Sequence, residues 1–404
     1  LSGAVLDPRS ILELHPAALE EGFPLAAKVT GNSFWWLNEQ GRRKFSGFLC
    51  PPPFRNRGKW MVSASEMVKW MASKAEEEGV EIHPGVSGAE ILVDDGRVLG
   101  VRTVDQGRSR SGEEKGTFQP GFDIHAEVTV LAEGTRGSLT KSLLSELDLD
   151  KDSNPQIWSV GVKELWEVEH SMKGEVVHTA GWPLTGNEFG GGWIYGLPDN
   201  RLSVGFVVGM DHGNAGFDYH AALQEWKTHP SISSLLEGGK LLKYGAKTIP
   251  EGGWFSLPEV AGDGFLILGD AAGFMNVQRL KGLHLAVKSG LVAARTAAKA
   301  LAENAESGNS ALTSFLSDFR QTWAGRELWK VRNFRQAFQK GFRAGVVRAG
   351  MDHLLGGRLP GRLPVEADHA RYKGGASPSK DLSFDGKLTF DRLTDVFHSG
   401  TSHE

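Results

Sequence analysis

Cysteine and long apolar runs are what this 404-residue sequence has least of. Its one cysteine, Cys50, excludes an internal disulfide and, without ligands from elsewhere, a four-thiolate cluster or zinc site. No stretch approaches the roughly 20 consecutive apolar residues that cross a bilayer, so no spanning helix is predicted, and no signal-peptide pattern opens the chain. The formal net charge of -4 gives no overall attraction to nucleic acid.

A glycine-rich nucleotide fingerprint is also missing. A dinucleotide-binding fold normally begins with a strand and a G-x-G-x-x-G turn that holds the pyrophosphate at a helix N-terminus, and this spacing occurs nowhere in the sequence. The chain opens on Leu1 rather than on methionine. We therefore expect that it starts after such a unit.

The elements that are present predict a mixed α/β chain. Ser63 and Glu66 have the spacing of a capping box, and Gly79 ends the helical pattern before a predicted strand. The segment AEILVDDGRVLGVRTV predicts a hairpin that turns at Asp95–Gly96. From about 155 to 262, alternating strands rich in tryptophan and glycine predict a mainly antiparallel inserted domain.

The segment FLILGDAAG carries the strongest sign of a ligand. In an α/β sheet, a strand such as Phe-Leu-Ile-Leu ends at the ligand crevice, where Gly269 and Gly273 let the backbone approach a cofactor. Asp270 can accept hydrogen bonds from a ribose or ribitol hydroxyl, and the following helix directs its N-terminus to the same place. The pattern is typical of flavin binding, although an aspartate that only caps a helix is the alternative.

A second strand, VTVLAEG, indicates the same kind of fold. A strand that ends in Glu133 and Gly134 before a turn resembles the strand that returns the chain beneath the FAD in flavoproteins with two dinucleotide folds. Alone it is a weak signal. The order of helix, hairpin, AEG, inserted sheet domain and GDAAG favours an α/β flavoprotein.

Many segments, in order, resemble the electron-transfer flavoprotein:ubiquinone oxidoreductase family. They include GAVLDP, GVEIHPG, VTVLAEG, GVKELWEV, HTAGWPL, WKTHPSI, LEGGK, YGAKTIPEGG, GFMNVQRLKG, AVKSG, VRNFR and the final SGTSHE. The family usually reads NVPKIKGTH where this chain has Gln278, Arg279 and Leu283, and it often carries a cysteine where Asp270 stands. The resemblance covers nearly the whole chain and implies truncation at both ends relative to the family.

The resemblance implies a monotopic membrane oxidoreductase that passes electrons from reduced electron-transfer flavoprotein through FAD and a 4Fe-4S cluster to ubiquinone, in the respiratory chain that serves fatty acid β-oxidation. It places the enzyme on the matrix face of the mitochondrial inner membrane or, alternatively, on a bacterial cytoplasmic membrane. The cluster ligands would lie after the end of this chain, so no metal ligand is expected here. No catalytic acid or base is expected, because electron transfer depends on cofactor spacing and potential. The residues expected at the FAD are Glu133, Gly134, Gly269, Asp270, Gly273 and Asn276.

The implied organisation has five parts. They are an FAD domain without its glycine-rich unit (1–154), a ubiquinone-binding β-rich domain (155–262), the return of the FAD domain (263–305), a helical membrane-contacting region (306–365) and a tail that leads to an absent cluster domain (366–404).

The segment EFGGGWIYG is the expected quinone site. In the family the ubiquinone head group meets backbone at a Gly-Gly pair after an aromatic residue, which corresponds to Gly190 and Gly191 after Phe189. A flat ring can lie against backbone that lacks Cβ, and amide groups can donate hydrogen bonds to a quinone carbonyl. A flexible or bulged glycine strand is the alternative.

Residues 330–357 predict a basic amphipathic helix. Phe334, Phe338 and Phe342 recur at every fourth position, and lysines and arginines occupy the remaining face. The pattern is typical of a helix on a membrane surface, a role that the resemblance also implies, whereas packing against the protein's own core is the alternative.

Two other functions remain open from the sequence. One is a reductase of the geranylgeranyl-reductase type, or another FAD-dependent reductase with the same core, although HTAGWPL and SGTSHE argue against it. The other is a non-catalytic fragment that binds only a membrane or a partner, which a measurement of bound flavin would separate from the enzymes. Structural rather than catalytic roles are expected for His178, His229 and His284.

Overall fold

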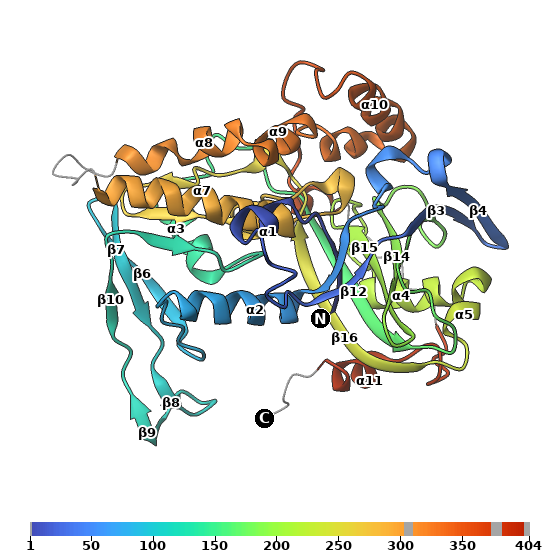
Figure 1. Ribbon diagram of the computed structural model, residues 1–404, viewed down its shortest axis with the longest axis horizontal. Helices are drawn as coiled ribbons and strands as arrows, with labels where there is room; N and C mark the ends of the chain where they lie inside the picture. Colours follow the sequence, from blue (N-terminus) through green and yellow to red (C-terminus); the bar gives the residue numbers. More distant parts are fainter. Residues whose placement is uncertain (1, 303–309, 373–381, 400–404) are drawn as a thin grey trace.

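The computed structural model describes residues 2–302, 310–372 and 382–399. In Figure 1 a large sheet with two helices beside it forms the right half of the molecule, and helices with smaller sheets form the left half. Mixed α/β architecture with an antiparallel sheet and a helical C-terminal part is therefore confirmed.

The large sheet has seven strands in the order β16-β12-β15-β14-β13-β3-β4, and all neighbours are antiparallel except β13 and β3. Two of its strands, β3 and β4, come from the range predicted for the FAD domain, so the sheet extends beyond residues 155–262. Its strands are β3 (Gly31–Asn38), β4 (Gly41–Ser46), β12 (Trp158–Glu167), β13 (Glu175–Gly181), β14 (Gly190–Leu197), β15 (Arg201–Gly209) and β16 (Lys240–Pro250).

The two faces of this sheet contact different layers. Because side chains alternate along a strand, Trp35 and Ile194 point to one face, where they pack with Trp226 of α4 (Tyr219–Lys227) and with α5 (Pro230–Leu236). The opposite face includes Tyr195, which packs with Met61 of the N-terminal sheet. This second face is the one that borders the candidate site.

The N-terminal sheet has three antiparallel strands, β1 (Ser2–Leu6), β5 (Trp60–Ser63) and β2 (Leu25–Lys28), in the order β1-β5-β2. Helix α1 (Arg9–Leu14) follows β1. Helix α2 (Ala64–Glu77) begins as predicted, because the Ser63 hydroxyl accepts the backbone N–H of Glu66 at 3.4 Å.

The predicted hairpin is confirmed in β6 (Gly88–Asp94) and β7 (Arg97–Thr103), which turn through Asp95 and Gly96 with φ of 44° and 80°. The strand predicted directly after Gly79 is wrong, because the next strand begins only at Gly88. Three short strands extend this region: β8 (Gln106–Arg108), β9 (Glu114–Gln119) and β10 (Asp123–His125).

The FLILGDAAG strand lies in a small sheet of order β11-β18-β17. Strands β11 (Thr129–Leu131) and β18 (Phe265–Ile267) are parallel, and β17 (Ala261–Gly262) is antiparallel to β18. After β11 the chain enters α3 (Ser138–Glu146). After β18 it forms α6 (Gly269–Ala272), the one-turn η4 (Val277–Arg279) and the long helix α7 (Leu283–Ala302).

The C-terminal part is helical but interrupted. One continuous helix over 330–357 is wrong, because Gly341 has a φ of +98° and separates the 3-10 helix η6 from α10. No helix of the described part of the chain is long and apolar enough to cross a membrane. The elements are η5 (Ser310–Ser314), α8 (Phe315–Gln321), α9 (Trp323–Lys330), η6 (Arg335–Lys340), α10 (Phe342–Leu354), η7 (Asp368–Arg371) and α11 (Arg392–Phe397).

Candidate functional site

An apolar cavity of about 460 Å³ lies between the large sheet and the segments that surround it. Its volume is in the range of cavities that bury small organic ligands. One wall is β3, β13 and β14, and the others are the one-turn helix η2 (Pro52–Phe54), the η4 turn, η6 and α10. The cavity lining includes Phe34, Trp36, Phe54, His178, Phe189, Gly190, Gly191, Trp193, Val277, Gln278, Leu280, Phe338, Phe342 and Ala349.

The phenylalanines of the predicted membrane stripe line this cavity. The ring centroids of Phe338 and Phe189 are 4.8 Å apart, and those of Phe342 and Trp36 are 5.6 Å apart. Phe334 also packs on Phe189, at 6.3 Å. The prediction that this stripe faces a membrane is therefore wrong, because the rings turn inward and build the cavity wall.

Arg335 was predicted to lie on the polar face of the same helix, and it is almost completely buried. Its Nε donates to Glu251 at 2.7 Å, and its two terminal nitrogens donate to Asp211 at 3.1 and 2.5 Å. The guanidinium also lies 4.2 Å from the centre of the Phe189 ring. Two buried carboxylates thus neutralise one buried cation, and the group ties η6 to the end of β15 and holds Phe189 at the cavity.

The two glycines expected at the quinone lie in the cavity wall. A Cβ on Gly190 would collide with the carbonyl oxygen of Val207, and one on Gly191 would collide with that of Thr179. Both glycines are therefore required by the close packing of β14 on its neighbours. A contact between them and a quinone stays a prediction, and a substitution such as Gly190→Val would disturb the sheet before it tested that contact.

The GDAAG turn has the backbone that the sequence predicts. Gly269 and Gly273 have φ of +56° and +93°, which favours glycine at both positions. The Asp270 carboxylate lies beside Gly282, whose carbonyl accepts the first backbone bonds of α7, and it has no hydrogen-bond partner among the described residues. Burial raises the pKa of Asp270, against a smaller opposing effect of Lys247. An unpartnered acceptor of this kind fits the hydroxyl of a bound flavin nucleotide.

Of the other residues predicted at the FAD, Glu133 and Asn276 already have hydrogen-bond partners within the protein. Glu133 accepts the backbone N–H of Leu139 and Thr140 at 3.2 and 2.7 Å, so its side chain caps α3. Gly134, with φ of +74°, borders open space. Asn276 is fully buried, and its amide donates to Glu327 at 2.9 Å. The structure brings Asp270 and its glycines together at one turn, and it directs Glu133 and Asn276 into contacts with protein.

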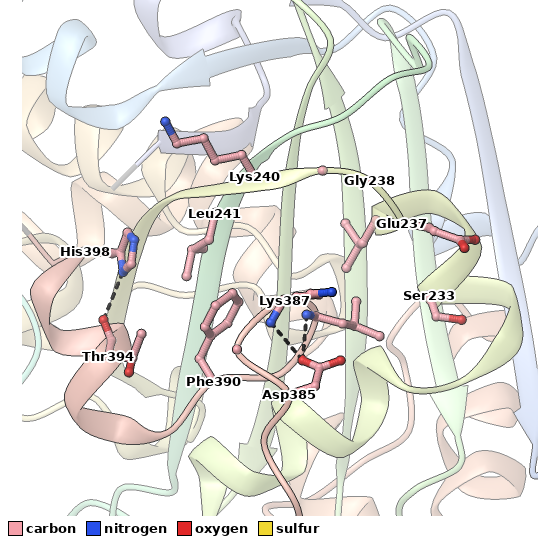
Figure 2. A pocket seen from close by; sticks show the side chains of 14 residues that line it. Ser233, Glu237, Gly238, Lys240, Leu241, Asp385, Lys387, Phe390, Thr394 and His398 are labelled. Carbon is pink, nitrogen blue, oxygen red and sulfur yellow. Dashed lines mark hydrogen bonds between the residues drawn. The ribbon is translucent and has the colours of Figure 1, made fainter.

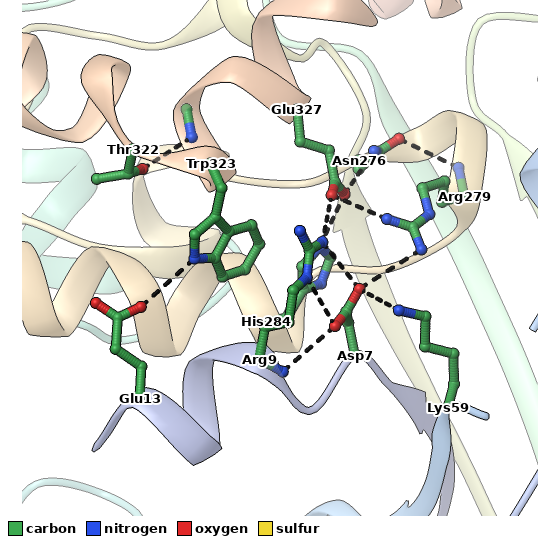
Figure 3. A network of polar contacts seen from close by, with 11 residues as sticks. Asp7, Arg9, Glu13, Lys59, Asn276, Arg279, His284, Thr322, Trp323 and Glu327 are labelled. Carbon is green, nitrogen blue, oxygen red and sulfur yellow. Dashed lines mark hydrogen bonds and ion pairs between the residues drawn. The ribbon is translucent and has the colours of Figure 1, made fainter. Parts of the chain in front are cut away.

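Asn276 belongs to a partly buried ionic network that the sequence did not predict (Figure 3). Asp7 accepts from Arg9 at 2.9 Å and from Lys59 at 2.6 Å, while Glu327 accepts from Arg9 at 3.0 Å and from Arg279 at 2.9 Å. These bonds hold the pKa of Asp7 far below its usual value, although burial alone would raise it. The network joins the first residues of the chain to the turn after GDAAG and to α9.

This network positions the segment that connects the two sites. Arg279 closes η4, and the adjacent Val277 and Gln278 line the cavity. The loop that leaves the GDAAG turn therefore continues directly into the cavity wall. A ligand at Asp270 and a ligand in the cavity would be separated by one short, ionically fixed segment.

A larger groove of about 900 Å³ lies where the C-terminal tail meets β16 (Figure 2). Its charged groups are mixed in sign and exposed, and the Asp385 carboxylate accepts the backbone N–H of Lys387 and Leu388 at 2.9 and 2.8 Å. These bonds close a turn, and residues 382–390 form no strand. The groove contains no buried polar atom that lacks a partner among the described residues, so we favour the apolar cavity as the functional site.

Solved structures share this fold, and several of their titles name a flavin-dependent or FAD-dependent enzyme. A chondrochloren halogenase of the FAD-dependent type is 21% identical with a TM-score of 0.56, over 86% of this chain and 78% of that one. A geranylgeranyl bacteriochlorophyll reductase-like protein from Thermoplasma acidophilum is 14% identical with a TM-score of 0.57, over 92% and 79%. At such low identity these similarities establish the fold, which is that of FAD-dependent enzymes, and nothing finer.

Sequence relatives are more specific. Residues 158–249 match the model of the ubiquinone-binding part of ETF-QO. The whole chain is 37% identical to the mitochondrial electron transfer flavoprotein-ubiquinone oxidoreductase of Oryza sativa subsp. japonica, over 70% of that protein, and 39% identical to the one of Homo sapiens, over 68%. The enzyme of the same name from Pseudomonas aeruginosa is 37% identical, over 75% of its length. The chain therefore belongs to the electron transfer flavoprotein-ubiquinone oxidoreductase family of enzymes.

Proposed function

We propose that this chain takes electrons from reduced electron-transfer flavoprotein and delivers them to ubiquinone, whose head group occupies the apolar cavity. The observation that carries the proposal is the position of the cavity. It is walled by aromatic rings and by Gly190 and Gly191, and through Val277 and Gln278 it shares one segment with the flavin-type turn at Asp270. An apolar ring can enter such a cavity, beside the segment that leaves the flavin-type turn.

FAD, when bound, supplies a carrier that takes up a pair of electrons and passes them on. Asp270 is the residue that would accept a hydrogen bond from its ribitol or ribose, because its half-buried carboxylate has no hydrogen-bond partner among the described residues. Gly269 and Gly273 would let the chain pass close to the nucleotide, and the N-terminus of α7 would face its electron-rich edge. Glu133 and Gly134 would contribute backbone at the end of β11.

A 4Fe-4S cluster does not fit the residues of this chain. Cys50 is its one cysteine and is buried, and burial raises the pKa of its thiol, which disfavours the thiolate that binds iron. We propose that the ligands of the family's cluster lie outside this sequence.

Membrane contact is proposed for the mouth of the cavity. We define the rim patch as the exposed apolar residues of α10 and of the one-turn helix η1 (Gly47–Leu49), namely Phe48, Leu49, Val347, Met351, Leu354 and Leu355. Leu354 is 86% exposed and Phe48 83% exposed, which is unusual for such large apolar side chains. Residues next to both segments line the cavity, so a lipid-soluble quinone could enter from a membrane held at this rim.

The location and the domain boundaries rest on the relatives. Some relatives are named mitochondrial and others are bacterial, so we propose the matrix face of the mitochondrial inner membrane or, as the alternative, a bacterial cytoplasmic membrane. The matched residues 158–249 fall inside the range 155–262 that we propose for the quinone-binding domain. A role in the respiratory chain follows from the same proposal.

Filling the cavity tests the function. Ala349 of α10 lines the cavity and is buried, whereas Ala344 of the same helix is exposed and lies outside it. We expect Ala349→Phe to weaken binding of ubiquinone-1, measured by calorimetry, by at least about tenfold, because the added ring occupies the ligand's volume. Ala344→Phe should bind as the original chain does. Equal affinity in both variants, with unchanged folding by circular dichroism, would place the quinone elsewhere.

A further inference from the structure

Two buried nitrogen atoms in the cavity wall have no hydrogen-bond partner. They are Nδ1 of His178 and Nε1 of Trp193, and both side chains line the cavity. His178 is only 2% exposed. Most buried polar groups are paired, and a buried donor without a partner costs about 1–3 kcal/mol, so two in one wall need an explanation.

The fold places these two residues side by side. His178 of β13 and Trp193 of β14 are direct cross-strand partners, so their side chains leave the sheet on the same face. Phe34 occupies the matching position on β3, and the Phe54 ring lies 5.1 Å from the imidazole of His178. Aromatic rings therefore surround these two nitrogens, which the protein itself leaves unpaired.

The chemistry of both groups specifies the ligand atom. An indole N–H can only donate. Burial, together with the positive charge of Lys281, lowers the pKa of His178 to about 3, so its imidazole is neutral and carries one proton. Its Nε2 lies 3.2 Å from the hydroxyl of Tyr195. When that hydroxyl donates to Nε2, the proton of the imidazole is on Nδ1, and both unpaired nitrogens are then donors.

We propose that His178 and Trp193 donate hydrogen bonds to one carbonyl oxygen of the quinone and thereby fix which carbonyl of the head group faces the sheet. This inference rests on the proposed function, and it assigns His178 a ligand contact where the sequence predicted a structural role. A carbonyl oxygen has two lone pairs and so can accept from both nitrogens. Tyr195 is the positioning residue, because it selects the tautomer of His178.

The carbonyl stretch of a bound quinone measures this contact without any flavin. We would bind ubiquinone-1, labelled with 13C at one carbonyl and then at the other, to the full 404-residue chain. Infrared difference spectra then report the hydrogen bonding of each carbonyl, and calorimetry gives the affinity. The variants are Trp193→Phe, which replaces the indole and its N–H donor by a smaller apolar ring, His178→Phe and Tyr195→Phe, with Trp70→Phe as the control.

In the unmodified chain one carbonyl band should lie at lower wavenumber than the other. Trp193→Phe and His178→Phe should each move that band back towards the free value and raise the Kd by about 3- to 10-fold, the range for one lost hydrogen bond. His178→Asn, whose amide can donate from the same δ position, should restore part of the shift. Trp70→Phe removes an indole that donates to Glu21 outside the cavity, so it should change neither quantity.

The outcomes separate this inference from the proposed function. If ubiquinone-1 binds but both carbonyl bands are alike, or if Trp193→Phe leaves them unchanged, the inference is wrong and the quinone site stands. If the unmodified chain does not bind ubiquinone-1, both fall together. Should His178→Phe fail to fold by circular dichroism, Trp193→Phe and Tyr195→Phe still decide, because each removes one polar atom and keeps an aromatic ring at its position.

Discussion

The large sheet and the β11-β18-β17 sheet differ in how many of their strands have hydrogen-bonded neighbours on both sides. Each inner strand of the large sheet has a hydrogen-bonded neighbour on both sides, and its cavity is walled by residues of the described chain. Strand β11 has β18 on one side and no strand on the other among the described residues, and Val130 at its centre is 47% exposed. Parallel sheets are normally buried on both faces. We call the large sheet with its cavity the proposed quinone half, and the β11-β18-β17 sheet with the GDAAG turn the proposed flavin half. The strands of the first half are paired within the described chain, whereas the second half has an unpaired edge at β11.

Both halves are nevertheless anchored in the same way. In the quinone half, Arg335 bridges Asp211 and Glu251 under the cavity. In the flavin half, Asp7 and Glu327 form ion pairs with basic side chains from three separate segments of the chain. Buried ion pairs are poor sources of stability but costly to break, so each network fixes a geometry more than it adds free energy.

The largest expected effect tests the open edge. Because the sequence lacks a glycine-rich pyrophosphate turn and one side of β11 has no neighbouring strand among the described residues, we expect the 404-residue chain to hold FAD weakly or not at all. Extending it with the glycine-rich strand, turn and helix of a relative should raise FAD affinity by about a thousandfold, or about 4 kcal/mol. Absorbance of flavin that survives dialysis gives the answer. Stoichiometric, dialysis-resistant FAD on the unextended chain would remove the difference between the two halves.

The next effect concerns the quinone half alone. Arg335→Leu leaves Asp211 and Glu251 buried without their cation, and we expect the free energy of unfolding to fall by about 3–5 kcal/mol. Arg348→Leu on the exposed side of α10 is the matched control and should change it by less than about 0.5 kcal/mol. Denaturant titrations of both variants provide the comparison. A small effect of Arg335→Leu would mean that water reaches these carboxylates.

Local patterns predicted the parts of each half that depend on neighbours in sequence. The Ser63 cap, the Asp95–Gly96 turn and the glycines of GDAAG follow from backbone chemistry within a few residues. The orientation of the phenylalanine stripe could not be predicted in this way, because phenylalanines at every fourth position form one apolar face whether that face contacts lipid or lines a cavity. The ionic network has no local signal either, since Arg9 and Glu327 are 318 positions apart.

The flavin half has a titratable anchor, so its stability should depend on pH. Burial alone would raise the pKa of Glu327, but the hydrogen bond from His284 and the charge of Arg279 outweigh it and lower the pKa from 4.5 to about 2. A lowered carboxyl pKa stabilises the fold above pH 4.5, and this contribution is lost as the pH falls towards 2. Glu327→Gln should cost about 2–3 kcal/mol at pH 7 and remove that part of the acid dependence.

Unfolding measured at several pH values between 2 and 7 separates this effect from general acid unfolding. Glu76→Gln, an exposed change on α2, is the matched control and should retain the full pH dependence. If Glu327→Gln and Glu76→Gln follow the same pH curve, the acid sensitivity belongs to other carboxylates and the network in Figure 3 is not an anchor of the flavin half.

The smallest effect tests whether the quinone half meets a membrane through its rim patch. The phenylalanines first expected to do so line the cavity, so Phe338→Ser should weaken quinone binding and leave vesicle binding nearly intact. Val347→Gln with Leu354→Gln removes two of the most exposed apolar groups of the patch and should lower partitioning onto anionic vesicles by about fivefold, or about 1 kcal/mol. The control Leu301→Gln, at a half-exposed position at the end of α7, should leave vesicle partitioning unchanged.

Sedimentation with vesicles at two salt concentrations also isolates the electrostatic part of vesicle binding, which weakens as salt rises. If the double variant and Leu301→Gln bind equally, the rim patch is not the membrane contact, and the cavity must be filled from solution or through another surface.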